Sequence, residues 1–337
     1  MPVEPLRLGI LGAARISERA VVAPARALGV RLVAVAARDW GRAQLFAAAH
    51  GVDRVVGSYA DLVADREVEA VYNPLANGLH APWNLAAIAA GKHVLSEKPF
   101  ASNAAEAGEV RDAGRHAGVV VMEGFHYRYH PLARRVHELL AGGELGELRH
   151  AEASLTIPAP PPADPRWSLA LAGGALMDLG CYSLHALRSL APWAGGEPRL
   201  VAARARERAG LPGVDESFVA DLSFPSGATG VARCDMAGTG VEMTWRVVGS
   251  AGEVFAPSFV LPHEDDRLVV RTRQGERAEH LGTRSSYTYQ LAAFVAAVRE
   301  GTPVPTDADE AVATMTLVDA CYRMAGLAPR PRYARLA

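Results

Sequence analysis

The chain has 337 residues, about twice the usual size of one domain, and 50% of them are hydrophobic, so two globular domains are expected. A formal net charge of −2, with no basic tract interleaved with aromatic residues, argues against a nucleic-acid partner. No apolar stretch reaches the roughly 20 residues that a membrane helix needs, and residues 1–6 lack the features of a signal peptide.

The first 125 residues alternate short apolar runs with amphipathic stretches, which is typical of strands and helices that wind a parallel sheet. Strands are expected at 6–11, 31–37, 70–73, 93–96 and 119–122, and helices at 16–28, 41–50, 82–90 and 104–117. Right-handed crossovers between such units predict a Rossmann-like dinucleotide-binding domain over residues 1–125.

After residue 125 the pattern indicates successive strands with few helices between them. A helix at 132–141 precedes strands at 148–157, 200–206, 217–224, 229–235, 243–249 and 267–272, and helices at 287–300 and 308–326 close the chain. Residues 158–165 are proline-rich and must form a loop. The fold class is therefore α/β, with a second, α+β domain over residues 126–337 that carries a large, mostly antiparallel open sheet for substrate binding and oligomerisation.

A glycine turn joins the first expected strand to the first helix, where backbone N–H groups can hold a pyrophosphate. The dinucleotide fingerprint G-x-G-x-x-G is altered here to Gly12, Ala14 and Ser17. The strand-turn-helix context favours a nucleotide site over a merely tight structural turn.

The end of the second strand, Ala37-Arg38-Asp39, bears on the choice of cofactor. A small residue followed by Arg38 leaves room for a 2′-phosphate and supplies a guanidinium for it, which favours NADP. Asp39 is either a ribose acceptor, which would favour NAD, or the cap of the following helix.

Lysine is rare in this chain, which has 33 arginines and only two lysines, Lys92 and Lys98. Lys98 ends a strand-like run before Pro99, and an ammonium group can shift its pKa and exchange a proton where a guanidinium cannot. Lys98 is therefore a candidate catalytic group, whereas Lys92, which follows Gly91 at a helix end, is expected to be a surface residue.

The chain resembles the Gfo/Idh/MocA oxidoreductase family over nearly its whole length. Four motifs carry the likeness: residues 12–16 (GAARI), 77–80 (NGLH), 97–99 (EKP) and 173–182 (GGALMDLGCY). Residues 35–39 and 173–182 look most like the dimeric dihydrodiol dehydrogenase group, which includes NADP-dependent xylose dehydrogenases. Many relatives have a histidine four residues after Asp178, where this chain has Tyr182, so its pH dependence should differ.

The resemblance implies two sets of binding residues. Glu97 should face the cofactor ribose, Asn77 and His80 should line the nicotinamide side, and the Lys98–Pro99 bond is expected to be cis. The expected cofactor-binding residues are Gly12, Ala14, Arg15, Ile16, Ala37, Arg38, Pro74, Leu75, Asn77, His80, Glu97, Lys98 and Arg166. Candidate substrate residues are His126, Tyr127, Arg128, Trp167 and His185; the first three could equally be hinge packing, and Trp167 either belongs to a lid or covers local apolar surface.

The expected catalytic residues are Lys98, Asp178 and Tyr182. Hydride transfer at a carbinol carbon needs a proton carrier and a positive charge beside the oxygen. We assign the proton to Tyr182, with its pKa lowered by the Lys98 ammonium, and the charge to Lys98; the reverse assignment stays open. Asp178, four residues before Tyr182, orients the substrate hydroxyl or Lys98, and the reserve donor is His185, for which a structural role is equally open.

These residues predict an NADP-preferring dehydrogenase or reductase, with NAD as the alternative cofactor, acting on a sugar or cyclic polyol. Two other functions stay open: a hydrolase or epimerase that recycles the hydride on a tightly held cofactor, and a non-catalytic nucleotide-sensing module. The three cysteines, Cys181, Cys234 and Cys321, are odd in number and far apart, which argues against a disulfide framework and a zinc cluster, so no metal and a reducing, cytoplasmic setting are expected. A homo-oligomer, a dimer or tetramer, is expected from the resemblance.

Overall fold

The computed structural model describes residues 4–333, which fall into two compact units. Unit 1 comprises Met1–His126 and Tyr287–Val312, and unit 2 comprises Tyr127–Ser286 and Ala313–Ala337. The predicted division after residue 125 lies next to the first of these boundaries. Residues 287–312, which the sequence assigned to the second domain, group with unit 1 because Arg299 donates to Glu69 and Thr306 donates to the Glu123 carbonyl oxygen.

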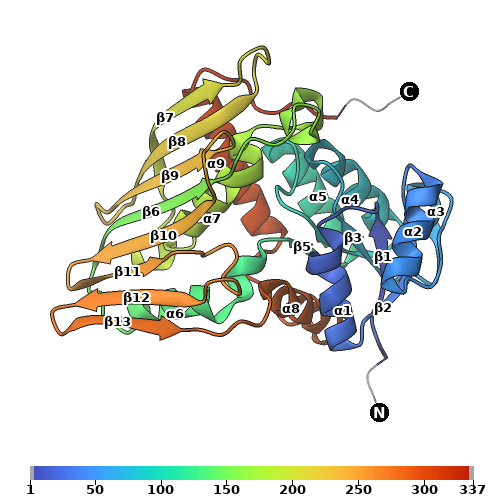
Figure 1. Ribbon diagram of the computed structural model, residues 1–337, viewed down its shortest axis with the longest axis horizontal. Coiled ribbons are helices and arrows are strands. Elements are labelled where there is room, and N and C mark those ends of the chain that lie inside the picture. Colours follow the sequence, from blue (N-terminus) through green and yellow to red (C-terminus); the bar gives the residue numbers. More distant parts are fainter. Residues whose placement is uncertain (1–3, 334–337) are drawn as a thin grey trace. The chain divides into compact units, whose positions relative to one another are not determined.

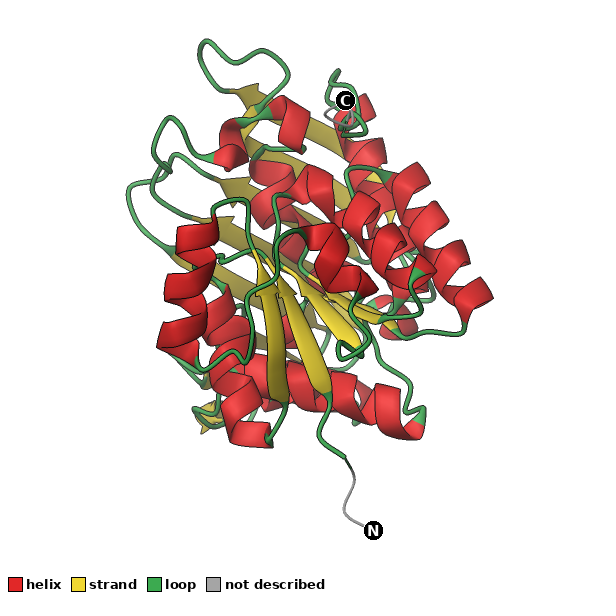
Figure 2. Cartoon of the chain, turned by 90° about the vertical axis from the view of Figure 1, so that its right-hand side faces the viewer, coloured by secondary structure: helices red, strands yellow, loops and turns green. Residues whose placement is uncertain are grey.

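Unit 1 contains a five-stranded parallel sheet in the order β2-β1-β3-β4-β5, flanked by helices in Figure 2. The strands are β1 (Arg7–Leu11), β2 (Arg31–Ala36), β3 (Ala70–Asn73), β4 (His93–Ser96) and β5 (Val121–Glu123). Their nearly continuous burial fits a sheet that is covered on both faces. The chain winds away from β1 in both directions, and ligands of such sheets bind at the carboxyl ends of the strands, beside the β1–β3 switch point.

The helices of unit 1 begin at positions that their capping residues determine. Asp39, Ser58 and Asn103 each accept a backbone N–H at the start of α2, α3 and α5. The elements are the π-helical turn η1 (Glu18–Val22), α1 (Ala23–Leu28), α2 (Trp40–His50), α3 (Tyr59–Ala64), the 3₁₀ turn η2 (Asn77–Leu79), α4 (His80–Ala89), α5 (Ala104–Ala117) and α8 (Ser286–Glu300).

Lys92 is not the surface residue that the sequence indicated. It is 9% exposed, and its Nζ donates to the carbonyl oxygens of Asp65 at 2.8 Å and Val68 at 2.7 Å. Burial lowers the pKa of this ammonium, and the charge of Asp65 partly opposes that shift. Lys92 therefore ties the end of α4 to the loop before β3, a structural task that a compact ammonium performs.

Unit 2 is built on an eight-stranded sheet in the order β13-β12-β11-β10-β6-β9-β8-β7, in which only β6 and β9 pair in parallel (Figure 1). The strands are β6 (Leu148–Thr156), β7 (Arg199–Glu207), β8 (Asp215–Ser223), β9 (Thr229–Asp235), β10 (Glu242–Gly249), β11 (Gly252–Ala256), β12 (Arg267–Thr272) and β13 (Gly275–His280). The predicted fold class, with a mostly antiparallel open sheet, is confirmed.

One face of this sheet is apolar and covered. Along β6, Ala151, Ala153 and Leu155 are buried, while His150 and Glu152 alternate with them on the other face. The helix α7 (Cys181–Arg188) packs on β6 and β9 from the covered side. The remaining elements of unit 2 are the short turns η3 (His126–Tyr129), η4 (Pro165–Trp167), η5 (Leu169–Leu171) and η7 (Ala191–Trp193), the π-helical turn η6 (Leu176–Gly180), α6 (Pro131–Ala141) and α9 (Ala308–Met324), which starts in unit 1.

Some short or polar elements were missed by the sequence analysis, among them α3, β11 and β13. The helix α3 has six residues, β11 has five, and β13 is a polar edge strand without a buried residue, so none shows a clear hydrophobic period. Within residues 4–333, no helix is long and apolar enough to cross a membrane.

Candidate active site in two halves

The glycine turn after β1 is tight and closed by the loop after β3. Gly12 has a φ of +97° and its N–H donates to the Ala36 carbonyl oxygen at 2.7 Å. A Cβ at Gly12 would lie 3.0 Å from Leu75 Cδ2 and 3.8 Å from the Tyr59 hydroxyl. Ser17, the third position of the fingerprint, has a buried hydroxyl with no hydrogen-bond partner among the described residues. This turn fits a group that approaches the backbone closely, as a pyrophosphate does.

At the end of β2, Asp39 serves as the cap of the following helix. Its Oδ1 accepts the backbone N–H of Arg42 at 2.7 Å, so the carboxylate caps α2. Arg42 Nη2 donates to the Ala13 carbonyl oxygen of the glycine turn at 3.0 Å. Burial raises the pKa of Tyr59, and the charges of Arg38 and Arg42 oppose that rise. The charges of Arg38 and Arg42 therefore both act on the phenol of Tyr59 near the end of β2, and the sequence analysis named only Arg38.

The loop after β3 is held against the turn after β4 by His80. Its Nδ1 lies 2.7 Å from the Pro99 carbonyl oxygen and its Nε2 lies 2.8 Å from the Leu75 carbonyl oxygen. Burial lowers the pKa of His80 to about 4, and the contacts with the two carbonyl oxygens oppose this shift. His80 is thus a clamp between two loops. The neighbouring Asn77 starts η2 and is half-buried, and Pro74 is buried.

The end of β4 carries Glu97 and Lys98. Glu97 is buried, and its Oε1 accepts the Tyr72 hydroxyl at 2.9 Å. Burial raises the pKa of Glu97, and the Lys98 charge opposes the rise. The Lys98–Pro99 bond is cis, as expected, and Lys98 itself is half-buried.

A chain of buried amides and a hydroxyl supports these strand ends from behind. Asn73 donates to Asn84 at 2.8 Å, and Asn84 donates to the Ser96 hydroxyl at 2.9 Å. The Glu97 N–H donates to the Asn73 carbonyl oxygen at 3.0 Å. Since buried polar groups are costly unless they are paired, this chain fixes the relative position of the ends of β3 and β4. Unit 1 thus brings the cofactor residues expected after β1, β2, β3 and β4 to one edge of its sheet.

Unit 2 holds the other expected site residues. Asp178 lies in the π-helical turn η6, where the Cys181 N–H bonds to the Leu176 carbonyl oxygen, so the α-helical spacing assumed between Asp178 and Tyr182 does not apply. Arg166 Nη1 lies 3.8 Å from Asp178 Oδ2. Arg166, expected to bind the cofactor, therefore stands beside the proposed catalytic carboxylate.

Tyr182 and His185 extend along α7 into the interior of unit 2. The Tyr182 residue is 5% exposed, and its ring centroid lies 6.0 Å from that of Tyr127. The Tyr127 hydroxyl lies 2.6 Å from His185 Nδ1. Burial holds the pKa of His185 well below its ordinary value, so its ring is neutral at pH 7.

The remaining candidate substrate residues are packed locally. Trp167 is 3% exposed, its Nε1 donates to the Pro160 carbonyl oxygen at 3.2 Å, and Arg208 lies over its ring. The His126 ring stacks on Tyr287, with centroids 3.8 Å apart, inside unit 1. Arg128, in η3, is half-buried.

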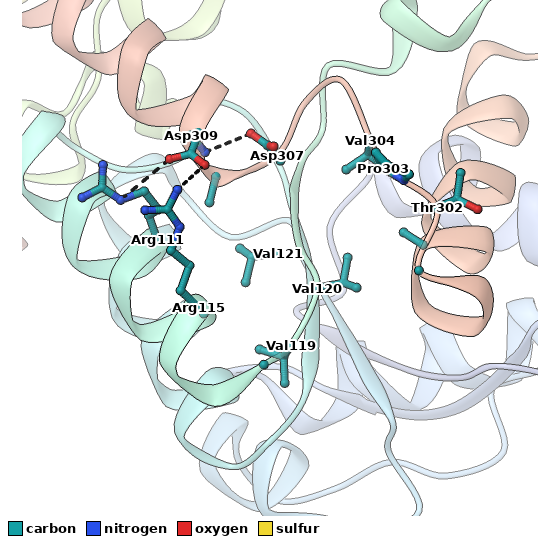
Figure 3. Close-up of a pocket in the computed structure, with 15 residues that line it drawn as sticks. Arg111, Arg115, Val119, Val120, Val121, Thr302, Pro303, Val304, Asp307 and Asp309 are labelled. Carbon is teal, nitrogen blue, oxygen red and sulfur yellow. Dashed lines mark hydrogen bonds and ion pairs between the residues drawn. The ribbon is translucent and has the colours of Figure 1, made fainter.

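A surface pocket of about 340 Å³ in unit 1 contains none of the predicted site residues (Figure 3). It lies between the end of α5 and the segment before α9, at residues that precede β5, which is the amino end of the strands. Arg115 and Asp309 form an ion pair at its rim, 2.5 Å apart. Ligands of parallel sheets bind at the opposite, carboxyl edge, so this pocket is not the candidate site.

The described residues hold no group of three or more histidine, cysteine or acidic side chains that could bind a metal ion. The three cysteines are free and buried.

A parallel sheet with a glycine turn at its switch point, joined to an open-sheet unit, defines a class of nucleotide-dependent oxidoreductases. Comparison with known proteins agrees. The oxidoreductase family with an NAD-binding Rossmann fold matches residues 6–125, and the GFO/IDH/MocA C-terminal domain matches residues 133–255. The chain belongs to the Gfo/Idh/MocA oxidoreductase family, which confirms the resemblance seen in the sequence.

Two curated relatives and one solved structure illustrate the likeness. D-xylose 1-dehydrogenase (NADP(+)) 2 of Haloferax volcanii is 37% identical over 95% of this chain and 97% of its own length. Trans-1,2-dihydrobenzene-1,2-diol dehydrogenase of Mus musculus is 34% identical over 81% of this chain and 79% of its own. KijD10, a 3-ketoreductase from Actinomadura kijaniata in complex with NADP and TDP-benzene, has a TM-score of 0.87 and 30% identity, covering 95% of this chain and 98% of its own.

Proposed function

We propose that this protein is an NADP-dependent oxidoreductase that transfers a hydride between the nicotinamide and a secondary or anomeric carbon of a sugar or cyclic polyol. The observation that carries this proposal is the use of Asp39 as the cap of α2. Because its carboxylate is engaged there, the residues left at the end of β2 for a cofactor are cationic, which suits a 2′-phosphate and opposes a free ribose hydroxyl. The similar xylose dehydrogenase and 3-ketoreductase are both named with NADP.

The residues of unit 1 fit this cofactor. Gly12 adopts the positive φ that the tight turn after β1 needs, Arg38 and Arg42 offer donors to a phosphate, and Glu97 offers a carboxylate. When bound, NADP accepts or supplies the hydride. The buried supports behind Glu97 and Lys98 hold these two side chains at the carboxyl edge of the sheet.

In this proposal Lys98 and Tyr182 divide the work on the substrate oxygen. The Lys98 ammonium donates to that oxygen and stabilises the negative charge that develops on it. The Tyr182 hydroxyl gives or takes its proton, and Asp178 orients the neighbouring hydroxyl. Burial keeps His185 neutral and bound to Tyr127, so it supports the ring behind Tyr182 better than it serves as a proton donor.

The substrate class follows from the relatives, among which are a xylose dehydrogenase and sugar 3-reductases. We propose that the protein works in the cytoplasm as a homo-oligomer. The free, buried cysteines suit a reducing compartment, and the sheet face of unit 2 that α7 leaves uncovered offers a surface for a second copy.

A substrate screen tests the function directly. Aldoses, inositols and dihydrodiols are offered with NADP and with NAD, and keto sugars with the reduced cofactors, while the absorbance of the reduced nicotinamide is followed. Turnover is expected with at least one sugar and faster with NADP. If no compound reacts in either direction and denaturation releases a bound cofactor, the protein is instead the hydrolase or epimerase that recycles its hydride.

A further inference from the structure

A buried ion pair in unit 2 joins the end of the described chain to the start of β8. Asp215 and Arg330 are 0% and 1% exposed, and Arg330 Nη2 donates to Asp215 Oδ1. The same guanidinium donates through Nη1 to the Gly213 carbonyl oxygen at 2.7 Å and lies 4.0 Å from the centroid of the Tyr322 ring. Arg330 is thereby fixed at both of its terminal Nη nitrogens and over one face of the guanidinium.

The carboxylate of Asp215, which Arg330 holds, also binds the segment that carries the proposed catalytic residues. Its Oδ2 accepts the backbone N–H of Leu176 at 2.7 Å, and its Oδ1 also accepts the Tyr322 hydroxyl at 3.0 Å. Leu176 is the first residue of η6, which contains Asp178 and leads directly into α7 with Tyr182. One buried carboxylate at the start of β8 thus holds both the start of η6 and the C-terminal segment that contains Tyr322 and Arg330.

The glycine pair before η6 is shaped by this contact. Gly174 has a φ of +129°, and a Cβ there would overlap Asp215 Oδ1 and Arg330 Nη2. A Cβ at Gly173 would overlap the Arg166 carbonyl oxygen. The space beside both glycines is therefore occupied by the protein itself. The Gly174 carbonyl oxygen accepts the Asp178 N–H at 3.0 Å, so the turn held by the ion pair also sets the backbone of Asp178.

The positive charge of Arg330 favours the ionised form of the buried Asp215 carboxyl group. Burial raises the pKa of Asp215, and the Arg330 charge is the largest effect opposing the rise. Without that charge the carboxyl group is driven toward its protonated form, which accepts hydrogen bonds more weakly and no longer holds the Leu176 N–H as firmly. Buried ion pairs often stabilise a fold no more than a well-packed apolar pair does, so we infer that this one serves the geometry of the segments it joins.

We propose that Arg330 is a positioning residue that, through Asp215, sets the start of the catalytic segment of unit 2. This inference rests on the proposed roles of Asp178 and Tyr182. It adds that a side chain beyond the last helix, outside the four family motifs seen in the sequence, controls the rate of the chemical step.

The test compares Arg330→Met and Arg330→Lys with Arg135→Met in the full-length protein. Arg135 is a matched control, because it also lies in unit 2 and makes two hydrogen bonds to one carboxylate, that of Glu279, away from η6. Two quantities are measured for each variant: hydrogen exchange of the amides of residues 174–182, and kcat, KM and NADP affinity with the substrate found in the screen.

For Arg330→Met we expect faster exchange over residues 174–182 and a fall in kcat of about 10- to 100-fold, with NADP affinity unchanged, because unit 1 is not altered. Arg330→Lys should show smaller changes in amide exchange and in kcat than Arg330→Met. Arg135→Met should change neither the exchange over residues 174–182 nor kcat. Unchanged exchange over 174–182, or a loss of kcat no larger than in Arg135→Met, would overturn the proposal.

The proposal stays testable if Arg330→Met does not fold or if no substrate is found. If Arg330→Met does not fold, Tyr322→Phe removes a single bond to Asp215 and must still speed exchange over 174–182, or the proposal fails. If the unmodified protein turns over no sugar, the proposed function fails, whereas the exchange comparison alone still decides whether Arg330 anchors this segment.

Discussion

Asp39 accepts the backbone N–H of Arg42 at 2.7 Å, and Arg42 in turn reaches back to the Ala13 carbonyl oxygen of the glycine turn. This pairing turns the acidic residue at the end of β2 into a helix cap. It also places a second guanidinium, that of Arg42, beside the glycine turn that follows β1, four residues after Arg38 in the sequence.

Arg38→Ala and Arg42→Ala should each weaken NADP binding by about 10- to 100-fold, because each removes a charge-assisted bond to the 2′-phosphate. NAD binding should hardly change. Fluorescence titration with both cofactors measures the effect. Asp39→Ala is the control: it should cost about 1 kcal/mol of unfolding free energy as a lost cap, with NADP still preferred. Equal losses for NADP and NAD would refute the 2′-phosphate role.

The two lysines of the chain make a matched pair. Lys98→Met should lower kcat by at least about 100-fold while leaving NADP affinity nearly intact, since the ammonium acts on the substrate oxygen. Lys92→Met should keep kcat and lose about 1–3 kcal/mol of unfolding free energy, because the carbonyl groups of Asp65 and Val68 lose their donor. Steady-state kinetics and urea unfolding separate the two effects, and full activity in Lys98→Met would sink the assignment.

Tyr182→Phe should lower kcat by about 100-fold or more at neutral pH, with KM changed little, if the phenol carries the proton. The pH profile of the remaining activity is the informative measurement. His185→Asn should reduce kcat less, because its neutral ring supports Tyr127 and does not titrate near pH 7. A Tyr182→Phe variant as active as the unmodified protein would transfer the proton role to Lys98.

Buried histidines predict acid sensitivity of the fold. Burial lowers the pKa of His80 and His130 to about 4 and that of His137 to about 3. Between an ordinary pKa of about 6.5 and these values, the unfolded chain binds protons that the folded chain refuses, so each histidine removes roughly 1.4 kcal/mol per pH unit as pH falls. Glu97 and Asp215, with pKa values raised by burial, act in the opposite sense.

Comparison of the unmodified protein with the His137→Gln variant isolates the contribution of His137 to the pH dependence of stability. His137→Gln can keep a bond to the Ser189 hydroxyl, to which His137 Nε2 lies at 3.2 Å, but does not titrate. Between pH 7 and pH 5 its unfolding free energy, from urea titrations, should fall by roughly 2 kcal/mol less than that of the unmodified protein. Parallel slopes in the two proteins would contradict the prediction.

The sequence predicted the parallel sheet well because its strands are short apolar runs ended by turn residues. The bounds of β3, β4 and α5 agree with the prediction. The polar edge strand β13 could not be seen, since its neighbours and not its own pattern make it a strand.

The candidate site was predictable where residues follow strand ends, as Gly12, Arg38 and Lys98 do. It was not predictable where tertiary contacts decide the role. Arg42 becomes a cofactor candidate only through its bond to Ala13, and Lys92 is buried only because two carbonyl groups from a distant loop surround it.

The buried position of Lys92 has a practical consequence for labelling. Its Nζ is engaged by two carbonyl oxygens, whereas Lys98, the other lysine of the sequence, is half-exposed. An amine-directed probe should therefore mark the proposed active site in the unmodified protein, and its attachment should be slowed by bound cofactor.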